Sequence, residues 1–198
     1  MVKTKIAVLV SGGGTNLQAL LDAQTAGKIP HGEIALVISN KERAYALTRA
    51  ENFGISHLVI SGKDFEARLQ ETLTEHGIQM IVLAGFMKIL SGAFTAKWPE
   101  RILNIHPALI PSFCGEGYYG LRVHEEALRY GVKVTGATVH FVNEIPDGGR
   151  IIAQKAVDIE EGDTPEILQR RVMEQAEWIL LPRAVEKVAA YYAATGEK

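Results

Sequence analysis

The chain has 198 residues, of which 47% are hydrophobic, and this apolar content suits one well-packed domain rather than two. Its formal net charge of -2 gives no overall basic field, which argues against a nucleic acid as the main ligand and favours a small molecule. Cys114 is the single cysteine, so no internal disulfide or thiolate metal cage can form, in keeping with a reducing cytoplasm. The first residues lead straight into a short apolar strand, without a signal-peptide core or a membrane span, so we expect a soluble cytoplasmic protein.

Five short apolar runs in the first half of the chain have the length and composition of buried β-strands. In chain order they are residues 6–10, 34–38, 57–60, 80–83 and 102–105. The segments between them space their apolar residues as helices do, with Leu17, Leu20 and Leu21 as an example. This alternation predicts an α/β fold: an open, mostly parallel twisted sheet with right-handed crossovers and helices on both faces.

The pattern changes after residue 132. Residues 132–142 and 150–157 have the composition of longer strands joined by a turn rich in Pro and Gly, which predicts an antiparallel extension of the sheet. The end of the chain is helical, with Thr164 as the cap and Pro165 in the first turn. Pro182 is expected to kink or break this helix.

The sequence Asn104-Ile-His106-Pro107 lies where the fifth predicted strand leaves the sheet, at the position where ligands bind in open α/β sheets. The amide of Asn104 can donate to an oxyanion, His106 can relay a proton near neutral pH, and Asp147 can orient or charge that imidazole. Taken alone, His106 is more simply interpreted as a residue that caps the strand, and Asp147 as one that opens a turn. Their occurrence together favours an acyl-transfer site.

A glycine-rich loop, residues 11–17, lies directly after the first strand and opens the first helix. Glycines there allow positive φ and a close approach of the backbone, and the free amides of the helix terminus favour an anion such as phosphate. The loop matches neither a Walker loop nor a dinucleotide fingerprint. A tight turn with Thr15 as the helix cap is the plainer interpretation, and it is compatible with phosphate binding.

Over nearly its whole length the chain resembles the phosphoribosylglycinamide formyltransferase family. The segments that carry the resemblance are residues 11–17, Ser39-Asn-Lys41, residues 83–90, 103–111 and 138–142, and Asp147-Gly-Gly149. The resemblance implies a Rossmann-like formyltransferase fold that occupies residues 1–198 as a single domain. It also implies transfer of a formyl group from 10-formyltetrahydrofolate, the co-substrate, to the amine of glycinamide ribonucleotide in purine synthesis, without a metal.

The site residues follow from the same resemblance, which makes Asn104, His106 and Asp147 catalytic, with a protonated His106 among the oxyanion donors. The residues that it assigns to the phosphate and amine of the ribonucleotide are Gly13, Gly14, Thr15, Asn16 and Glu177, with Glu174 as the alternative to Glu177. Those that it assigns to the folate are Arg68, Met87, Lys88, Ile89, Leu90 and Asn104. As charged residues, Arg68 and Lys88 are equally consistent with ordinary solvated side chains.

The chain departs from the family pattern in two places. The stretch from Cys114 to His124 is longer than the corresponding loop of many relatives, which leaves the conformation of a lid open. The late helix is one residue longer before Glu177, and Trp178 stands where relatives have histidine. A nucleophilic role for Cys114 has no base to support it, and the histidines 106, 124 and 140 lack the spacing of zinc ligands.

Three rival functions remain. A methionyl-tRNA formyltransferase needs an RNA-binding domain for which residues 160–198 are too few, and a formyltetrahydrofolate hydrolase is expected to carry a regulatory domain before the first strand. A nucleotide-binding module would leave the predicted catalytic residues unused. The sequence fits either a monomer or a homodimer. A sharp turn after the catalytic strand suggests that the Ile110–Pro111 bond is cis.

Overall fold

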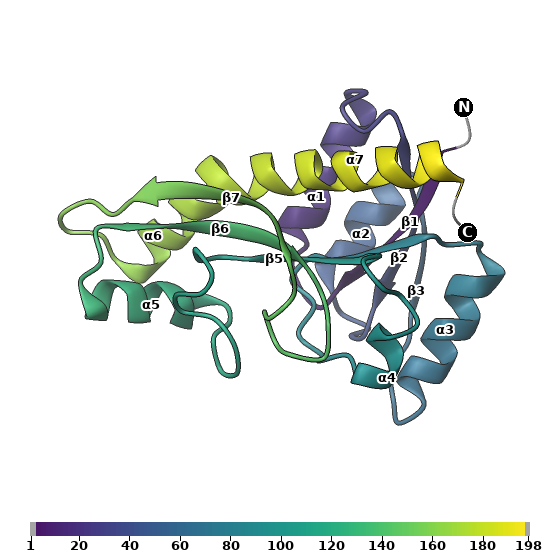
Figure 1. Ribbon diagram of the computed structural model, residues 1–198, viewed down its shortest axis with the longest axis horizontal. Helices are drawn as coiled ribbons and strands as arrows, with labels where there is room; N and C mark the ends of the chain where they lie inside the picture. Colours follow the sequence, from purple (N-terminus) through teal and green to yellow (C-terminus); the bar gives the residue numbers. More distant parts are fainter. Residues whose placement is uncertain (1–2, 197–198) are drawn as a thin grey trace.

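A seven-stranded sheet forms the centre of the computed structural model, which describes residues 3–196 (Figure 1). Its order is β3-β2-β1-β4-β5-β6-β7. The strands are β1 (Thr4–Val10), β2 (Gly32–Ser39), β3 (Ser56–Val59), β4 (Met80–Leu83), β5 (Ile102–His106), β6 (Val134–Phe141) and β7 (Ile151–Asp158). All seven predicted strands are confirmed, and their ends differ from the prediction by at most two residues.

The pairing confirms the predicted fold class. β1 pairs in parallel with β2 and β4, β2 with β3, and β4 with β5, whereas β6 pairs antiparallel with both β5 and β7. The chain moves outward from β1 in one direction through β2 and β3 and then returns to β4 on the other side. The carboxyl ends of β1 and β4 therefore flank a topological switch point, the position at which open α/β sheets bind ligands.

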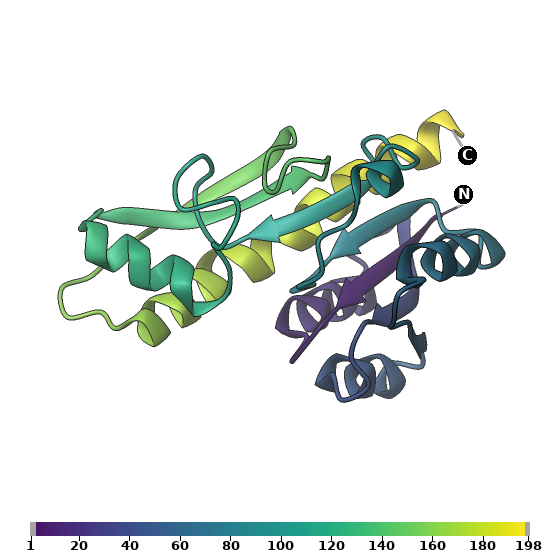
Figure 2. The ribbon, with the colours of Figure 1, turned by 90° about the horizontal axis from the view of Figure 1, so that it is seen from below.

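Helices cover both faces of the sheet, as Figures 1 and 2 show. They are α1 (Thr15–Thr25), α2 (Tyr45–Asn52), α3 (Phe65–Glu75), α4 (Gly92–Thr95), α5 (Leu121–Tyr130), α6 (Pro165–Val172) and α7 (Trp178–Thr195), with a π-helical turn, η1 (Met173–Glu177), between α6 and α7. One buried cluster joins α1 and α7 to the sheet, and a second joins α3 and α4 to the opposite face. The apolar side chains of the central parallel strands β1 and β4 are buried on both faces, as expected for such a sheet.

Of the two expected effects of Pro182, a kink or a break, the break does not occur, because Pro182 lies inside the continuous helix α7. Pro182 is the fifth residue of α7, so its missing N–H affects only the bond to the carbonyl of Trp178 at the start of the helix. The irregularity lies just before, in the π turn. In the part of the chain that the structure describes, no helix is long and apolar enough to cross a membrane.

Candidate active site

Ser11, at the carboxyl end of β1, connects the three loops that surround the switch point. Its N–H donates to the carbonyl of Gly85 at 3.2 Å, and its hydroxyl donates to Asn40 Oδ1 at 2.7 Å. The same hydroxyl accepts from the N–H of Met87 at 2.8 Å. The glycine loop, residues 12–14, is therefore fixed beside the segment that follows β4.

Asn104 and His106 are two residues apart on β5, so their side chains leave the same face of the sheet. Asp147 reaches both from the loop between β6 and β7: its Oδ1 lies 3.5 Å from Asn104 Nδ2 and its Oδ2 lies 3.5 Å from His106 Nδ1. The N–H of Gly115 donates to Oδ2 at 2.9 Å. The structure thus brings together the three residues that the sequence predicts as a catalytic unit.

The sharp turn that carries Asp147 depends on a close backbone approach. Asp147 has a φ of 56°, which is unusual for a residue with a side chain. A Cβ atom at Gly149 would overlap the carbonyl oxygen of Phe141, so only glycine allows the chain to enter β7 at this point. The Asp-Gly-Gly sequence therefore places the carboxylate over the end of β5.

The protonation state of His106 in the free protein follows from its hydrogen bonds and its burial. Its Nε2 lies 2.8 Å from the carbonyl oxygen of Phe113, which is only an acceptor, so Nε2 carries the hydrogen and Nδ1 faces Asp147. Burial lowers the pKa of His106 from 6.5 and outweighs the opposing charge of Asp147 and the hydrogen bond to Phe113. The imidazole is therefore mainly neutral at pH 7, and Nδ1 is the position at which it gains a proton.

Asp147 remains ionised at neutral pH. Its burial favours the neutral form, but the hydrogen bond with His140 and the positive charge that His106 carries when protonated both oppose this effect, and on balance the pKa of Asp147 is lowered from 3.8. The N–H of Gly115 also favours the carboxylate. A buried carboxylate next to a neutral imidazole is suited to stabilise that imidazole when it accepts a proton.

His140 is a member of the site to which the sequence interpretation gave no catalytic role. The antiparallel register places it on β6 opposite Asn104, and its Nε2 lies 3.1 Å from Asn104 Nδ2. Its Nδ1 lies 2.8 Å from the carbonyl of Phe141 and donates a hydrogen bond to it, so Nε2 of the neutral ring accepts from Asn104. Nε2 also lies 3.4 Å from Asp147 Oδ1, to which it can donate only when it carries a proton. Its contact with Asn104 depends on the register between β5 and β6, which the sequence alone does not give.

The stretch from Cys114 to His124 consists of a loop followed by the first turn of α5. The Ile110–Pro111 bond before it is cis, as the sharp turn suggested. The thiol of Cys114 donates to the carbonyl of Pro111 at 3.3 Å, and burial together with the charge of Asp147 raises its pKa. A raised pKa keeps the thiol protonated, which disfavours a nucleophilic role.

His124 is fully buried in α5, and neither ring nitrogen has a hydrogen-bond partner among the described residues. Burial, with a smaller contribution from the charge of His106, lowers the pKa of His124 to about 4. The imidazole is therefore neutral in the folded protein, and protonation requires disruption of its surroundings.

Because the unfolded chain protonates His124 near pH 6.5 and the folded chain only near 4, acidification over this interval is expected to destabilise the fold by up to about 3 kcal/mol. This contribution to the free energy of unfolding is fully present above pH 6.5 and is lost as the pH falls towards 4. His124→Leu removes this contribution, so its unfolding free energy should depend less on pH. Denaturant titrations from pH 7 to 4 test this, with the exposed His57→Leu as control; parallel pH profiles for His124→Leu and the unmodified protein would contradict it.

Asn16 and Glu177 form a buried pair at the start of α1. Asn16 Nδ2 donates to Glu177 Oε2 at 2.6 Å, and burial raises the pKa of Glu177 against the effect of this hydrogen bond. Asn16 Oδ1 has no partner among the described residues. Glu174, the alternative to Glu177, lies on the surface and binds Arg170 at 2.8 Å. The geometry therefore favours Glu177 as the residue that faces the site.

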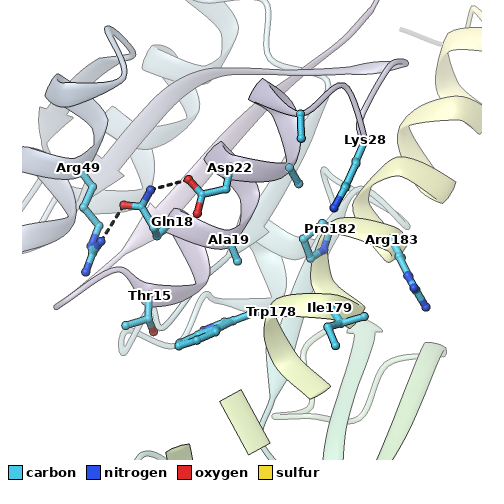
Figure 3. Close-up of a pocket in the computed structure, with 12 residues that line it drawn as sticks. Thr15, Gln18, Ala19, Asp22, Lys28, Arg49, Trp178, Ile179, Pro182 and Arg183 are labelled. Atoms are coloured by element: carbon cyan, nitrogen blue, oxygen red, sulfur yellow. Dashed lines mark hydrogen bonds between the residues drawn. The ribbon is translucent and has the colours of Figure 1, made fainter. Parts of the chain in front are cut away.

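A π turn, η1, lies in the helix in which the sequence predicts an additional residue. A π turn holds more residues than an α turn and often occurs at functional sites. In η1 the last residue, Glu177, is buried, and Trp178 follows directly after it. Trp178 lines a cavity of about 750 Å³ between α1 and the start of α7, and Thr15 and Arg49 line the same cavity (Figure 3).

The residues after β4 form a second recess of about 430 Å³, which Lys88, Ile89 and Leu90 help to line. The backbone N–H and C=O groups of these three residues have no hydrogen-bond partner among the described residues. Met87 and Ile89 are exposed, and Lys88 Nζ lies 5.1 Å from the ring centroid of Phe65.

Arg68 does not line this recess. It lies on α3, where its Nη1 donates to the carbonyl of Ser61 at 3.3 Å. Between residues 3 and 196, no group of three or more His, Cys, Asp or Glu side chains is arranged to hold a metal ion.

Comparison with known proteins places this geometry in a family. Residues 4–185 match the family model described as formyl transferase. The trifunctional purine biosynthetic protein adenosine-3 of Gallus gallus is 46% identical over 201 residues, which cover 98% of this chain and 19% of that protein. The chain therefore spans about a fifth of the length of this relative.

In two further comparisons the match covers most of this chain and most of the relative. The phosphoribosylglycinamide formyltransferase of Haemophilus influenzae is 43% identical over 92% of this chain and 85% of its own. The crystal structure of glycinamide ribonucleotide transformylase 1 from Symbiobacterium toebii superposes with a TM-score of 0.88 at 42% identity, over 96% of this chain and 89% of that one. The chain belongs to the formyl transferase family.

Proposed function

We propose that this protein transfers the formyl group of 10-formyltetrahydrofolate to the amine of glycinamide ribonucleotide, a step of de novo purine biosynthesis. The observation that carries the proposal is the contact of Asp147 with both Asn104 and His106, at the edge of the sheet where the glycine loop also lies. Formyl transfer needs an oxyanion donor and a proton acceptor next to each other. Relatives named for this activity, at about 40% identity, support it.

The ribonucleotide binds along the start of α1 in this proposal. The amides of Gly13, Gly14 and Thr15 hold its phosphate, because none of them donates to a protein acceptor among the described residues. Asn16 and Glu177 meet the amine end, since a buried carboxyl with a raised pKa and the unpartnered Asn16 Oδ1 offer acceptors for N–H groups.

The folate binds along residues 87–90. The free N–H and C=O groups of Lys88, Ile89 and Leu90 fit a heterocycle that presents both donors and acceptors, and the exposed side chains of Met87 and Ile89 provide apolar surface for it. Arg68 is the proposed partner of the anionic tail of the folate. Its guanidinium is exposed and makes one hydrogen bond at 3.3 Å, so it is readily redirected.

In the reaction, the amine nitrogen bonds to the formyl carbon, and the bond from this carbon to the folate nitrogen then breaks. One N–H of Asn104 is held by His140, while the other makes only a 3.5 Å contact with Asp147 and is available to the oxyanion. Neutral His106 accepts the amine proton at Nδ1, with Asp147 stabilising the imidazolium, which adds a second donor for the oxyanion. The departing folate nitrogen receives the proton.

We further propose that residues 1–198 act as one formyltransferase domain in the cytoplasm, as a monomer or a homodimer, with small molecules as the only partners. The near-neutral charge of the chain and the extent of the family match, residues 4–185, support this assignment.

Consumption of 10-formyltetrahydrofolate by the purified protein tests the proposed function. We expect consumption only when glycinamide ribonucleotide is present, with one formylated ribonucleotide formed for each folate consumed. Consumption without the ribonucleotide would instead indicate a hydrolase, and no consumption under either condition would indicate a binding module.

Gly14→Val is expected to raise the KM for the ribonucleotide sharply and to leave folate binding nearly intact. Gly14 has a φ of 73°, and a Cβ there would lie 2.6 Å from the Cβ of Ala46, so valine must displace the loop that carries the amides. Steady-state kinetics with each substrate varied measures the effect. Gly12→Ala is the control, because its Cβ would enter open space. An unchanged ribonucleotide KM in folded Gly14→Val would refute the assignment.

Ile89→Pro is expected to weaken binding of a folate analogue strongly, whereas Lys88→Ala should change it only modestly. Proline removes the free N–H of Ile89 and constrains the segment, while Lys88→Ala leaves the backbone groups in place. Isothermal titration of both variants gives the two affinities. Equal affinities would show that the backbone of this segment does not bind the folate.

A further inference from the structure

Residues of helix α2 donate hydrogen bonds to the carbonyl groups of the glycine loop. The N–H of Ala46 donates to the carbonyl of Gly12 at 3.1 Å, and Nε of Arg49 donates to the carbonyl of Gly13 at 2.8 Å. In a trans peptide the C=O of one residue and the N–H of the next point in opposite directions. The amides of Gly13 and Gly14 are therefore directed away from α2.

Arg49 is itself fixed in place. Its Nη1 donates to Gln18 Oε1 at 2.7 Å, and Gln18 Nε2 donates in turn to Asp22 Oδ1 at 2.8 Å, as the dashed lines of Figure 3 show. The guanidinium lies 5.1 Å from the ring centroid of Tyr45. Its Nη2 has no hydrogen-bond partner among the described residues. A positive group thus lies against the loop with three N–H groups, two of them on Nη2, that have no acceptor among the described residues.

We propose that Arg49 is both the positioning residue of the glycine loop and a direct ligand of the ribonucleotide phosphate. Nε fixes the Gly13 carbonyl, so the loop amides are oriented before the ligand arrives, and Nη2 donates to a phosphate oxygen. Charge-assisted hydrogen bonds from a guanidinium to phosphate are stronger than those between neutral groups. Thr15 and Arg49 line the same cavity, and the contacts of Arg49 with Gly13 and Gln18 place the guanidinium beside the start of α1. The identity of the phosphate-bearing ligand rests on the proposed function.

Arg49→Gln and Arg49→Lys test this role, with Arg183→Gln as the matched control, since Arg183 lines the cavity from α7. Each variant is assayed with glycinamide ribonucleotide and with the riboside that lacks the phosphate. For Arg49→Gln we expect the ribonucleotide KM to rise about ten- to a hundredfold, with kcat and the folate KM little changed and riboside kcat/KM unaffected. Arg49→Lys keeps the positive charge but not the planar set of guanidinium donors, so its ribonucleotide KM should lie between those of the unmodified protein and Arg49→Gln. Arg183→Gln should have the same ribonucleotide KM as the unmodified protein.

An equal loss of kcat/KM for ribonucleotide and riboside in Arg49→Gln would overturn the proposal, because it would show general damage to the fold. An unchanged ribonucleotide KM would overturn it as well. Calorimetric binding of inorganic phosphate to the unmodified protein and to Arg49→Gln needs no catalysis. If the unmodified protein transfers no formyl group but Arg49→Gln still binds phosphate at least tenfold more weakly, the proposed function fails and the role of Arg49 stands. Equal phosphate affinity would refute that role.

Discussion

Asn104→Ala is expected to lower kcat for formyl transfer by about a hundred- to a thousandfold, the usual effect of removing one oxyanion donor, with both substrates binding almost normally. His140 fixes the amide of Asn104 at 3.1 Å in the free protein, so this donor is oriented before the substrates bind. Alanine removes the oxyanion donor and also leaves His140 Nε2 without its hydrogen-bond partner. His106→Ala should lower kcat at least as much, because it removes the proton acceptor and the second donor.

Single-turnover formyl transfer at saturating substrate measures this loss directly. Asn52→Ala, an exposed asparagine at the end of α2, is the matched control and should transfer at the normal rate. Titration of a folate analogue separates a loss of binding from a loss of rate. A kcat within about tenfold of normal in folded Asn104→Ala would show that this amide does not stabilise the oxyanion.

Asp147→Asn is expected to lower kcat by about a hundredfold or more, the contribution typical of general acid–base catalysis. Asparagine keeps the shape but removes the charge that raises the pKa of His106, so this pKa, already lowered by burial, falls further. The protonated form of His106 becomes less stable during transfer. Any acidic limb of the kcat profile that reflects protonation of free His106 should move to lower pH.

The pKa of His106 in both proteins is measured by NMR titration of the imidazole nitrogens, alongside single-turnover rates across pH. Asp158→Asn, at the exposed end of β7, controls for the loss of one negative charge. The double variant Asn104→Ala/Asp147→Asn should lose less than the sum of the two single losses in free energy, because both residues act on one intermediate. A normal rate and an unshifted His106 pKa in Asp147→Asn would remove Asp147 from the mechanism.

The secondary structure could be predicted from the sequence because it depends on short-range patterns. Buried parallel strands need continuous apolar runs such as Met80–Leu83, and the helices between them repeat apolar residues every three or four positions. The prolines that follow His106 end the strand, and Asp147-Gly-Gly149 makes a turn that few other sequences allow. These local constraints predict that Asn104 and His106 lie at the carboxyl end of a strand and that Asp147 lies in a turn.

Which residues meet across the sheet depended on the tertiary structure. His140 contacts Asn104 because of the register between β5 and β6. Arg49 reaches the carbonyl of Gly13, 36 residues earlier in the sequence, because α2 packs against the glycine loop. A π turn, which sequence periodicity does not reveal, turns Glu177 inward and leaves Glu174 on the surface. The protonation of His106 in the free protein also depends on the tertiary structure, because a pKa depends on burial and on neighbours from other strands, and neither is encoded in the local sequence around a histidine.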